Sequence, residues 1–136
     1  MDLYDQEKAA EVWQRVQHRE PRNYYAMAEL EGKISRQCQG LYRKGFAKHT
    51  VSKLYRQSQS RKRALEAIAR QAGEPRHHME EMSRRADAGT LLELLGRAAW
   101  GYDPEHPVYG PMFRQMREEC AEGQRLLLEA TAPRGK

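Results

Sequence analysis

Four glutamates of this chain could meet inside a helical fold, because each falls on or beside a row of residues spaced three and four apart. They are Glu31, Glu93, Glu119 and Glu122. A carboxylate that is buried without a partner is energetically costly. Several carboxylates at one level of a helical bundle therefore predict a cation between them, either a metal ion or a basic side chain. If the cation is a metal, ligands that are all oxygen suit a hard ion.

One basic side chain is placed to be that cation. Arg61 falls on the inward row of residues 50–71, three residues after Ser58. Arginine keeps its charge and presents a fork of donors that fits carboxylates. Lys62 or Arg63 is the alternative inward residue if the helix is rotated by one or two positions.

The elements that carry these residues are predicted to be helices. Ala, Leu, Glu, Gln, Arg and Lys are abundant and favour helices, whereas the alternation typical of strands is nearly absent. With 136 residues, the chain is expected to form a single domain, residues 1–136. Four main helices are predicted at residues 24–46, 50–71, 86–102 and 111–130. A short leading helix is expected at 6–17, within a leader of residues 1–20, and a loose tail at 131–136.

Each predicted helix has one row of residues that should face the core. In the first two helices the rows are Tyr24, Met27, Glu31, Ile34, Cys38 and Leu41, and Val51, Leu54, Ser58, Arg61, Leu65 and Ile68. In the last two they are Leu92, Leu95 and Ala99, and Met112, Met116, Glu119, Gly123, Leu126 and Leu127. Glu93 and Trp100 lie beside the third row, and Trp100 and Trp13 are interpreted as packing residues.

Composition favours a cytoplasmic protein with no membrane segment. No apolar stretch approaches the roughly 20 residues that a membrane span needs. The acidic start of the chain lacks the apolar segment of a secretory signal. The two cysteines, Cys38 and Cys120, are too few for a disulfide framework. Cys38 is interpreted as a small core residue and Cys120 as a residue that flanks the core.

Two stretches in the last third of the chain resemble a known family. "LLELLGRAAWGYDPEHPVYGP" and "YGPMFRQMREECAEGQRLLLE" are similar to ferritin-like proteins, in particular to small bacterial rubrerythrin-type members. The leader "MDLYDQEKAAEVWQRVQ" and the seven-residue steps from Glu31 to Cys38 and from Glu93 to Trp100 fit the same family. The resemblance implies an antiparallel ferritin-like four-helix bundle with a short extra N-terminal helix. It also implies an ancestral role in iron or peroxide chemistry.

The resemblance further implies where a metal site once lay. The family's di-iron site takes one glutamate from each of two helices and a Glu-x-x-His pair from each of the other two. Glu31 and Glu93 match the single glutamates, and Glu119 matches the first residue of one pair. Glu122 stands in place of the histidine of that pair.

The second Glu-x-x-His pair has no counterpart in this chain. Ser58 stands where its glutamate should be, and Arg61 stands where its histidine should be. A guanidinium there opposes a metal ion electrostatically, so the site is expected to be vestigial. The resemblance then implies that Arg61 replaces the metal and bridges Glu31, Glu93 and Glu119. The chain is therefore expected to have lost di-iron redox activity and to act as a structural or interaction protein. A homodimer is one expected assembly, because family members often pair, and no cofactor is expected.

Two alternative functions stay open, and so does the question of whether the chain is an enzyme. The first is residual binding of iron or another divalent metal, in iron or peroxide metabolism, with Glu31, Glu93, Glu119 and Glu122 as ligands. The second is binding of an anion or nucleic acid by residues 43–63, which include no acid. Tyr42, Phe46 and Tyr55 would add stacking. No known nucleic-acid motif frames this stretch, so a solvated helix face is the favoured interpretation.

The histidines are interpreted as surface residues. Residues 77–81 contain two histidines and two glutamates. They are expected to form a polar loop rather than a metal site, because adjacent histidines point apart on a helix. His49 and His106 lie near predicted helix ends, where surface positions are usual.

Overall fold

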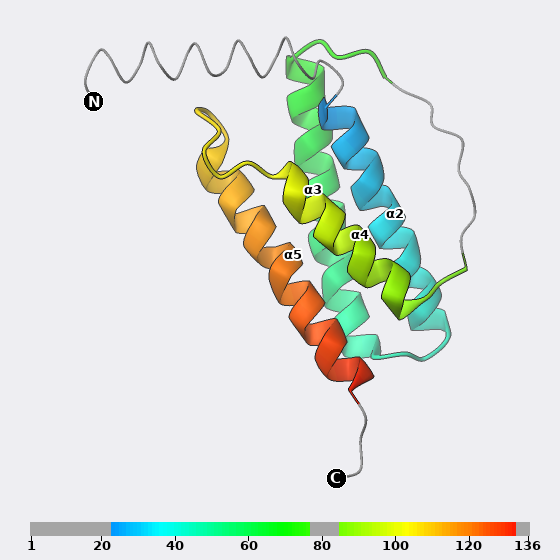
Figure 1. The fold of residues 1–136 in the computed structure, drawn as a ribbon. Helices are drawn as coiled ribbons and strands as arrows, with labels where there is room; N and C mark the ends of the chain where they lie inside the picture. Colours follow the sequence, from blue (N-terminus) through cyan, green and yellow to red (C-terminus); the bar gives the residue numbers. More distant parts are fainter. Residues whose placement is uncertain (1–22, 77–84, 133–136) are drawn as a thin grey trace.

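The computed structural model describes residues 23–76 and 85–132. Within these ranges the chain forms four α-helices and no strand: α2 (Asn23–Arg43), α3 (Lys48–Gln71), α4 (Ala88–Gly101) and α5 (Gly110–Thr131) (Figure 1). The prediction of an all-α fold with four main helices is confirmed for this part of the chain. The predicted leader helix at residues 6–17 lies outside the described residues. Of the expected tail, residue 131 still belongs to α5, residue 132 directly follows that helix, and residues 133–136 lie outside the described residues.

The connection after α2 begins earlier than predicted, because the helix ends at Arg43 instead of residue 46. Gly45 adopts a left-handed φ of 79°, which a glycine tolerates without strain. The amide of Phe46 donates to the carbonyl of Leu41 at 3.0 Å, and the amide of Gly45 donates to the carbonyl of Tyr42 at 3.0 Å. These two bonds form a Schellman motif, the usual way in which a glycine ends a helix.

The helices pack in pairs around one core. α2 packs along α3, α4 packs along α5, α2 packs against α4, and α3 contacts α5 more locally (Figure 1). Each helix therefore turns one face toward a shared interior. No helix in the described ranges combines the length and the apolar character that crossing a membrane requires.

The buried rows agree with the prediction on α2 and α3. On α4 and α5 the prediction is confirmed at Leu95, Met116, Gly123 and Leu127, whereas each of the other predicted members lies one residue from a buried position. The observed rows on the last two helices are Leu91, Leu95, Ala98 and Tyr102, and Phe113, Met116, Cys120, Gly123 and Leu127. The leucines near the start of α4 allow more than one row, and the row that packs is the one that buries the large ring of Tyr102. Trp100 is 85% exposed, so the prediction that it packs in the core is wrong.

Candidate functional site

Glu31 lies in the core of the bundle and accepts hydrogen bonds on both of its carboxylate oxygens. Its exposed fraction is 0%. Oε1 accepts from Ser58 Oγ and from Arg61 Nη2, each at 3.0 Å. Oε2 accepts from Arg61 Nε at 2.7 Å and from the hydroxyl of Tyr102. The cost of removing this carboxylate from water is offset by donors from α3 and from the end of α4.

Arg61 supplies the positive charge of this group of side chains. The group comprises Glu31, Ser58, Arg61, Tyr102 and, at its edge, Glu119, and it is called the Arg61 centre below. Its side chain is 3% exposed, and its third donor, Nη1, binds Glu119 Oε1 at 2.9 Å. Burial alone would lower the pKa of Arg61, but the hydrogen bonds and charge of Glu31 outweigh burial and raise that pKa above its ordinary value. Arg61 therefore stays charged and links α2, α3 and α5. The alternative inward residues, Lys62 and Arg63, are half-buried and exposed.

A row of neutral donors leads to the same carboxylate. Gln59 Nε2 donates to Ser35 Oγ at 2.9 Å, and Ser35 Oγ donates to Ser58 Oγ at 3.0 Å. Ser58 Oγ lies 2.7 Å from the main-chain carbonyl oxygen of Glu31 and 3.0 Å from its Oε1. Because a hydroxyl has one proton, Ser58 shares that proton between the two acceptors. The N–H and O–H groups of this chain of hydrogen bonds are directed toward Glu31, so they help Arg61 to stabilise the buried carboxylate.

Glu119 reaches the centre from the edge of α5. Its side chain is 28% exposed, and the fully buried position of that turn belongs to Cys120. Helices α5 and α3 approach closely at Gly123, one turn after Glu119. A Cβ added to Gly123 would lie only 2.8 Å from Leu54 Cδ2. This glycine lets α5 come near α3, which keeps Glu119 within reach of the guanidinium. Glu119 can therefore balance part of the charge of Arg61 while it remains partly hydrated.

Tyr102 also belongs to the centre, although the sequence-based site does not include it. The ring is buried at the end of α4, and its hydroxyl donates to Glu31. Burial and the charge of Glu31 raise the pKa of Tyr102 above its ordinary value, so the phenol keeps its proton. A sequence signal for this position exists: Leu91, Leu95, Ala98 and Tyr102 are spaced by four, three and four residues.

The same row explains the position of Glu93, which lies outside the centre. Glu93 is exposed on α4, whereas its neighbours Leu91, Leu94 and Leu95 are buried. The prediction that Arg61 bridges to Glu93 is therefore wrong.

Glu122 is also separate from the centre. Its side chain is 44% exposed and pairs with Arg125 on the same helix. The hydrogen bonds from Arg125 hold the pKa of Glu122 below its ordinary value. Of the predicted carboxylates, the structure brings only Glu31 and Glu119 to Arg61.

The two thiols lie beside this centre but are not reactive. Cys38 and Cys120 are both buried and free. Burial raises the pKa of each thiol to about 12, although the nearby Arg61 acts in the opposite direction. Both therefore stay protonated and behave as small apolar residues. The interpretation of Cys38 as a core residue is confirmed, and Cys120 lies in the core rather than at its flank.

His106 is buried, so the prediction of a surface position is wrong. Its Nδ1 accepts from the amides of Val108 and Tyr109 at 3.1 and 2.9 Å, next to the start of α5. Its Nε2 lies 3.2 Å from the hydroxyl of Tyr24. Burial lowers the pKa of His106, and an accepting Nδ1 requires the neutral imidazole. His49 is exposed, and residues 77–81 lie outside the described residues.

The donor set at the centre fits a guanidinium and does not fit a metal ion. The oxygens of Glu31 that a metal would need are already bonded to Arg61, and a fixed positive charge lies between the two carboxylates. In residues 23–76 and 85–132, no group of three or more His, Cys, Asp or Glu side chains is arranged to hold a metal. Comparison with protein families, curated proteins and solved structures finds no match to this chain.

Proposed function

We propose that this chain is a ferritin-like, antiparallel four-helix-bundle protein that has lost di-iron redox activity. Arg61 takes the position of the metal, and the protein acts as a structural or interaction protein. The observation that carries this proposal is the set of contacts from the Arg61 guanidinium to Glu31 and Glu119. By the resemblance, these two residues stand at ligand positions of the family, and Arg61 stands at a third.

Cross-helix contacts support the antiparallel arrangement. Three of the pairs that link α2 to α3 are Gln39 with Tyr55, Ser35 with Ser58, and Glu31 with Arg61. Along these pairs the residue number falls on α2 while it rises on α3, which is expected for neighbouring helices that run in opposite directions. Gln124 with Leu92 and Phe113 with Tyr102 follow the same rule on α5 and α4. Such pairing is typical of up-down bundles.

Metal content provides the direct test. The protein is expressed in iron-supplemented medium, purified without chelators and measured by elemental analysis. We expect far less than one iron per chain, because a guanidinium fills the space between the carboxylates. A content of one or two irons per chain would contradict the loss of the site and favour the residual-metal alternative. That alternative has less support, because Glu93 and Glu122 lie away from Arg61.

A gain-of-function variant tests the ancestry more sharply. Ser58→Glu combined with Arg61→His rebuilds the Glu-x-x-His pair on α3 beside Glu31. We expect this variant to bind a divalent metal such as Co²⁺, with an absorbance change that saturates near a simple ratio of metal to chain. The matched control is Ser60→Glu with Arg63→His, the same spacing at exposed positions of α3. Equal binding by both variants, or no binding by a folded centre variant, would count against a metal-site origin.

The proposed partner is a second copy of the chain or another protein. Support comes from the 85% exposure of Trp100, since a large apolar side chain in water is often part of an interface. Sedimentation velocity of the native chain and of Trp100→Ala tests this: a dimer that the substitution weakens is expected. The proposed cytoplasmic location rests on the two free thiols, Cys38 and Cys120, which suit a reducing compartment.

A further inference from the structure

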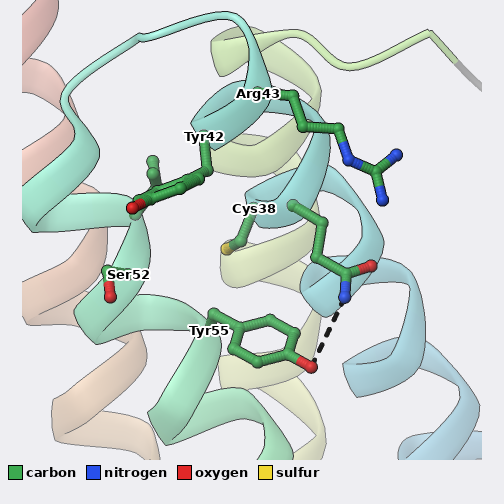
Figure 2. A pocket seen from close by; sticks show the side chains of 7 residues that line it. Cys38, Tyr42, Arg43, Ser52 and Tyr55 are labelled. Carbon is green, nitrogen blue, oxygen red and sulfur yellow. Dashed lines mark hydrogen bonds between the residues drawn. The ribbon is translucent and has the colours of Figure 1, made fainter.

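A cavity of about 260 Å³ lies near the turn between α2 and α3 (Figure 2). The last turns of α2 contribute Cys38, Gln39, Tyr42 and Arg43, and the first turns of α3 contribute Val51, Ser52 and Tyr55. Neither Glu31 nor Arg61 lines it. The cavity therefore does not open onto the buried ion pair, and among its lining residues Cys38 is the one that also lies beside that pair.

The walls of this cavity combine two aromatic rings with an apolar floor. In Figure 2 the side chains of Tyr42 and Tyr55 lie on either side of the Cys38 sulfur. Cys38 and Val51 are buried and form the floor, while Tyr42 is 48% exposed at the mouth. Flat aromatic surfaces beside a small apolar floor favour a planar ring as ligand. Pockets for drug-sized ligands usually exceed about 300 Å³, so a single ring suits this volume better.

The rim of the cavity carries polar and positively charged groups. Gln39 Nε2 donates to the hydroxyl of Tyr55 at 3.4 Å, a long bond that a ligand can readily replace. Arg43 is exposed on the rim, and in Figure 2 its guanidinium points away from the two tyrosine rings, so its side chain has to rotate to meet a ligand at the mouth. Lys48 Nζ lies 5.4 Å from the centre of the Tyr42 ring.

The surrounding charge selects an anion. No Asp or Glu occurs between residues 32 and 65, the stretch that forms both walls, whereas lysines and arginines recur along it. A concave site lined by one sign of charge concentrates ligands of the opposite sign. An arginine fork binds a carboxylate in a defined geometry. Covalent chemistry at the floor is not expected, because burial raises the pKa of the Cys38 thiol to about 12.

We infer that this cavity binds a small aromatic carboxylate. The ring lies between Tyr42 and Tyr55 over the Cys38 floor, and the carboxylate meets Arg43 at the rim. Gln39 and Ser52 offer hydrogen bonds to a ring substituent. Since a ligand of this size makes few contacts, we expect a dissociation constant in the high micromolar to low millimolar range.

The probe is 4-hydroxybenzoate, titrated into the full ¹⁵N-labelled chain and followed by two-dimensional NMR. We expect saturable shifts of amides that belong to the lining residues. Arg43→Gln should weaken binding about tenfold, as expected for loss of a charged hydrogen bond. The matched control, Arg56→Gln, removes the same charge from an exposed position on α3 that does not line the cavity, and should change affinity less than about twofold. Phenol, which lacks the carboxylate, should bind as weakly to the native chain as 4-hydroxybenzoate binds to Arg43→Gln.

A blocking variant guards against an electrostatic artefact. Ser52→Phe places a ring in the cavity and should abolish the shifts while the helical circular dichroism signal is retained. The inference is overturned if no saturable shift occurs, or if Arg43→Gln and Arg56→Gln weaken binding equally. It is also overturned, in favour of a nucleic-acid surface, if a thymidine oligonucleotide shifts the same amides and has a lower dissociation constant than 4-hydroxybenzoate.

Discussion

Arg61 and Arg125 each bind two glutamates, yet their surroundings are opposite. The side chain of Arg61 is 3% exposed and joins carboxylates from two other helices. The side chain of Arg125 is 55% exposed and joins Glu122 and Glu129 on its own helix, α5. The same combination of charges is therefore present once in the core and once in water.

The difference shows that burial, rather than the number of ion pairs, decides what an ion pair contributes. Around Arg125, water solvates any charge that loses its partner, so the pair adds little to stability. Around Arg61, a charge that loses its partner stays in a poorly solvating interior. A buried pair is weak evidence for high net stability, but it makes the fold depend on each of its members.

The largest expected effect comes from removing the buried cation. Arg61→Leu leaves Glu31 without its main donor and should lower the free energy of unfolding by about 3–5 kcal/mol. Urea denaturation followed by circular dichroism measures this loss. Arg63→Leu, an exposed position two residues along α3, is the control and should change stability little. Similar losses in both variants would mean that the contrast between core and surface does not hold.

A smaller effect is expected when one neutral donor is removed from the same centre. Tyr102→Phe keeps the ring in the core but deletes the hydroxyl that donates to Glu31. We expect a loss of about 1.5–3 kcal/mol, the range for a hydrogen bond to a charged group. Tyr55→Phe, which removes a long bond at the surface, should change the urea midpoint much less. An unchanged midpoint for Tyr102→Phe would show that Arg61 alone satisfies the carboxylate.

Acid should reveal a second buried group, His106. Burial lowers its pKa in the folded chain, whereas the unfolded chain keeps a value near 6.5. The unfolded state therefore binds the proton first, so this contribution to stability is complete above about pH 6.5 and declines as the pH falls below that value. Urea midpoints at a series of pH values measure the decline, and His106→Gln should reduce it. The same slope in both proteins would assign the decline to other groups.

The smallest effect is expected at the surface pair. Arg125→Gln removes the cation from Glu122 and Glu129, but both carboxylates remain hydrated. The thermal midpoint should not change measurably in physiological salt, because exposed ion pairs are screened. A clear drop in the midpoint would show that the surface pair is stronger than its exposure indicates.

The sequence was sufficient to predict the helices and part of the centre. Apolar periodicity and helix-breaking residues located all four described helices, and the rows on α2 and α3 correctly gave Glu31, Ser58 and Arg61 as inward residues. Each of these two helices has one main apolar stripe, although on α3 the spacing alone left Lys62 or Arg63 open as the inward residue. Figure 1 shows these two helices packed side by side, as such stripes require.

The other half of the centre was harder to predict, for two physical reasons. On α4, closely spaced leucines define more than one row, so Glu93 was placed beside the inward row as a partner of Arg61, and Tyr102 was left out. On α5, Glu119 was correctly given as a partner of Arg61, but it lies at the edge of the buried row, which Cys120 occupies, and Gly123 permits the close approach of α3 and α5 nearby. Such an approach depends on tertiary packing, which the spacing of residues within one helix does not encode.

The bonds between α2 and α3 also set how far one helix can slide along the other. A displacement of one turn, about 5.4 Å, would carry Arg61 past Glu31 and strand both charges in an apolar interior. An interface between α2 and α3 made only of aliphatic side chains would tolerate that displacement far better, because one leucine can take the place of another with little loss of packing energy. The Arg61–Glu31 contact therefore fixes the register in which α2 and α3 pack along each other.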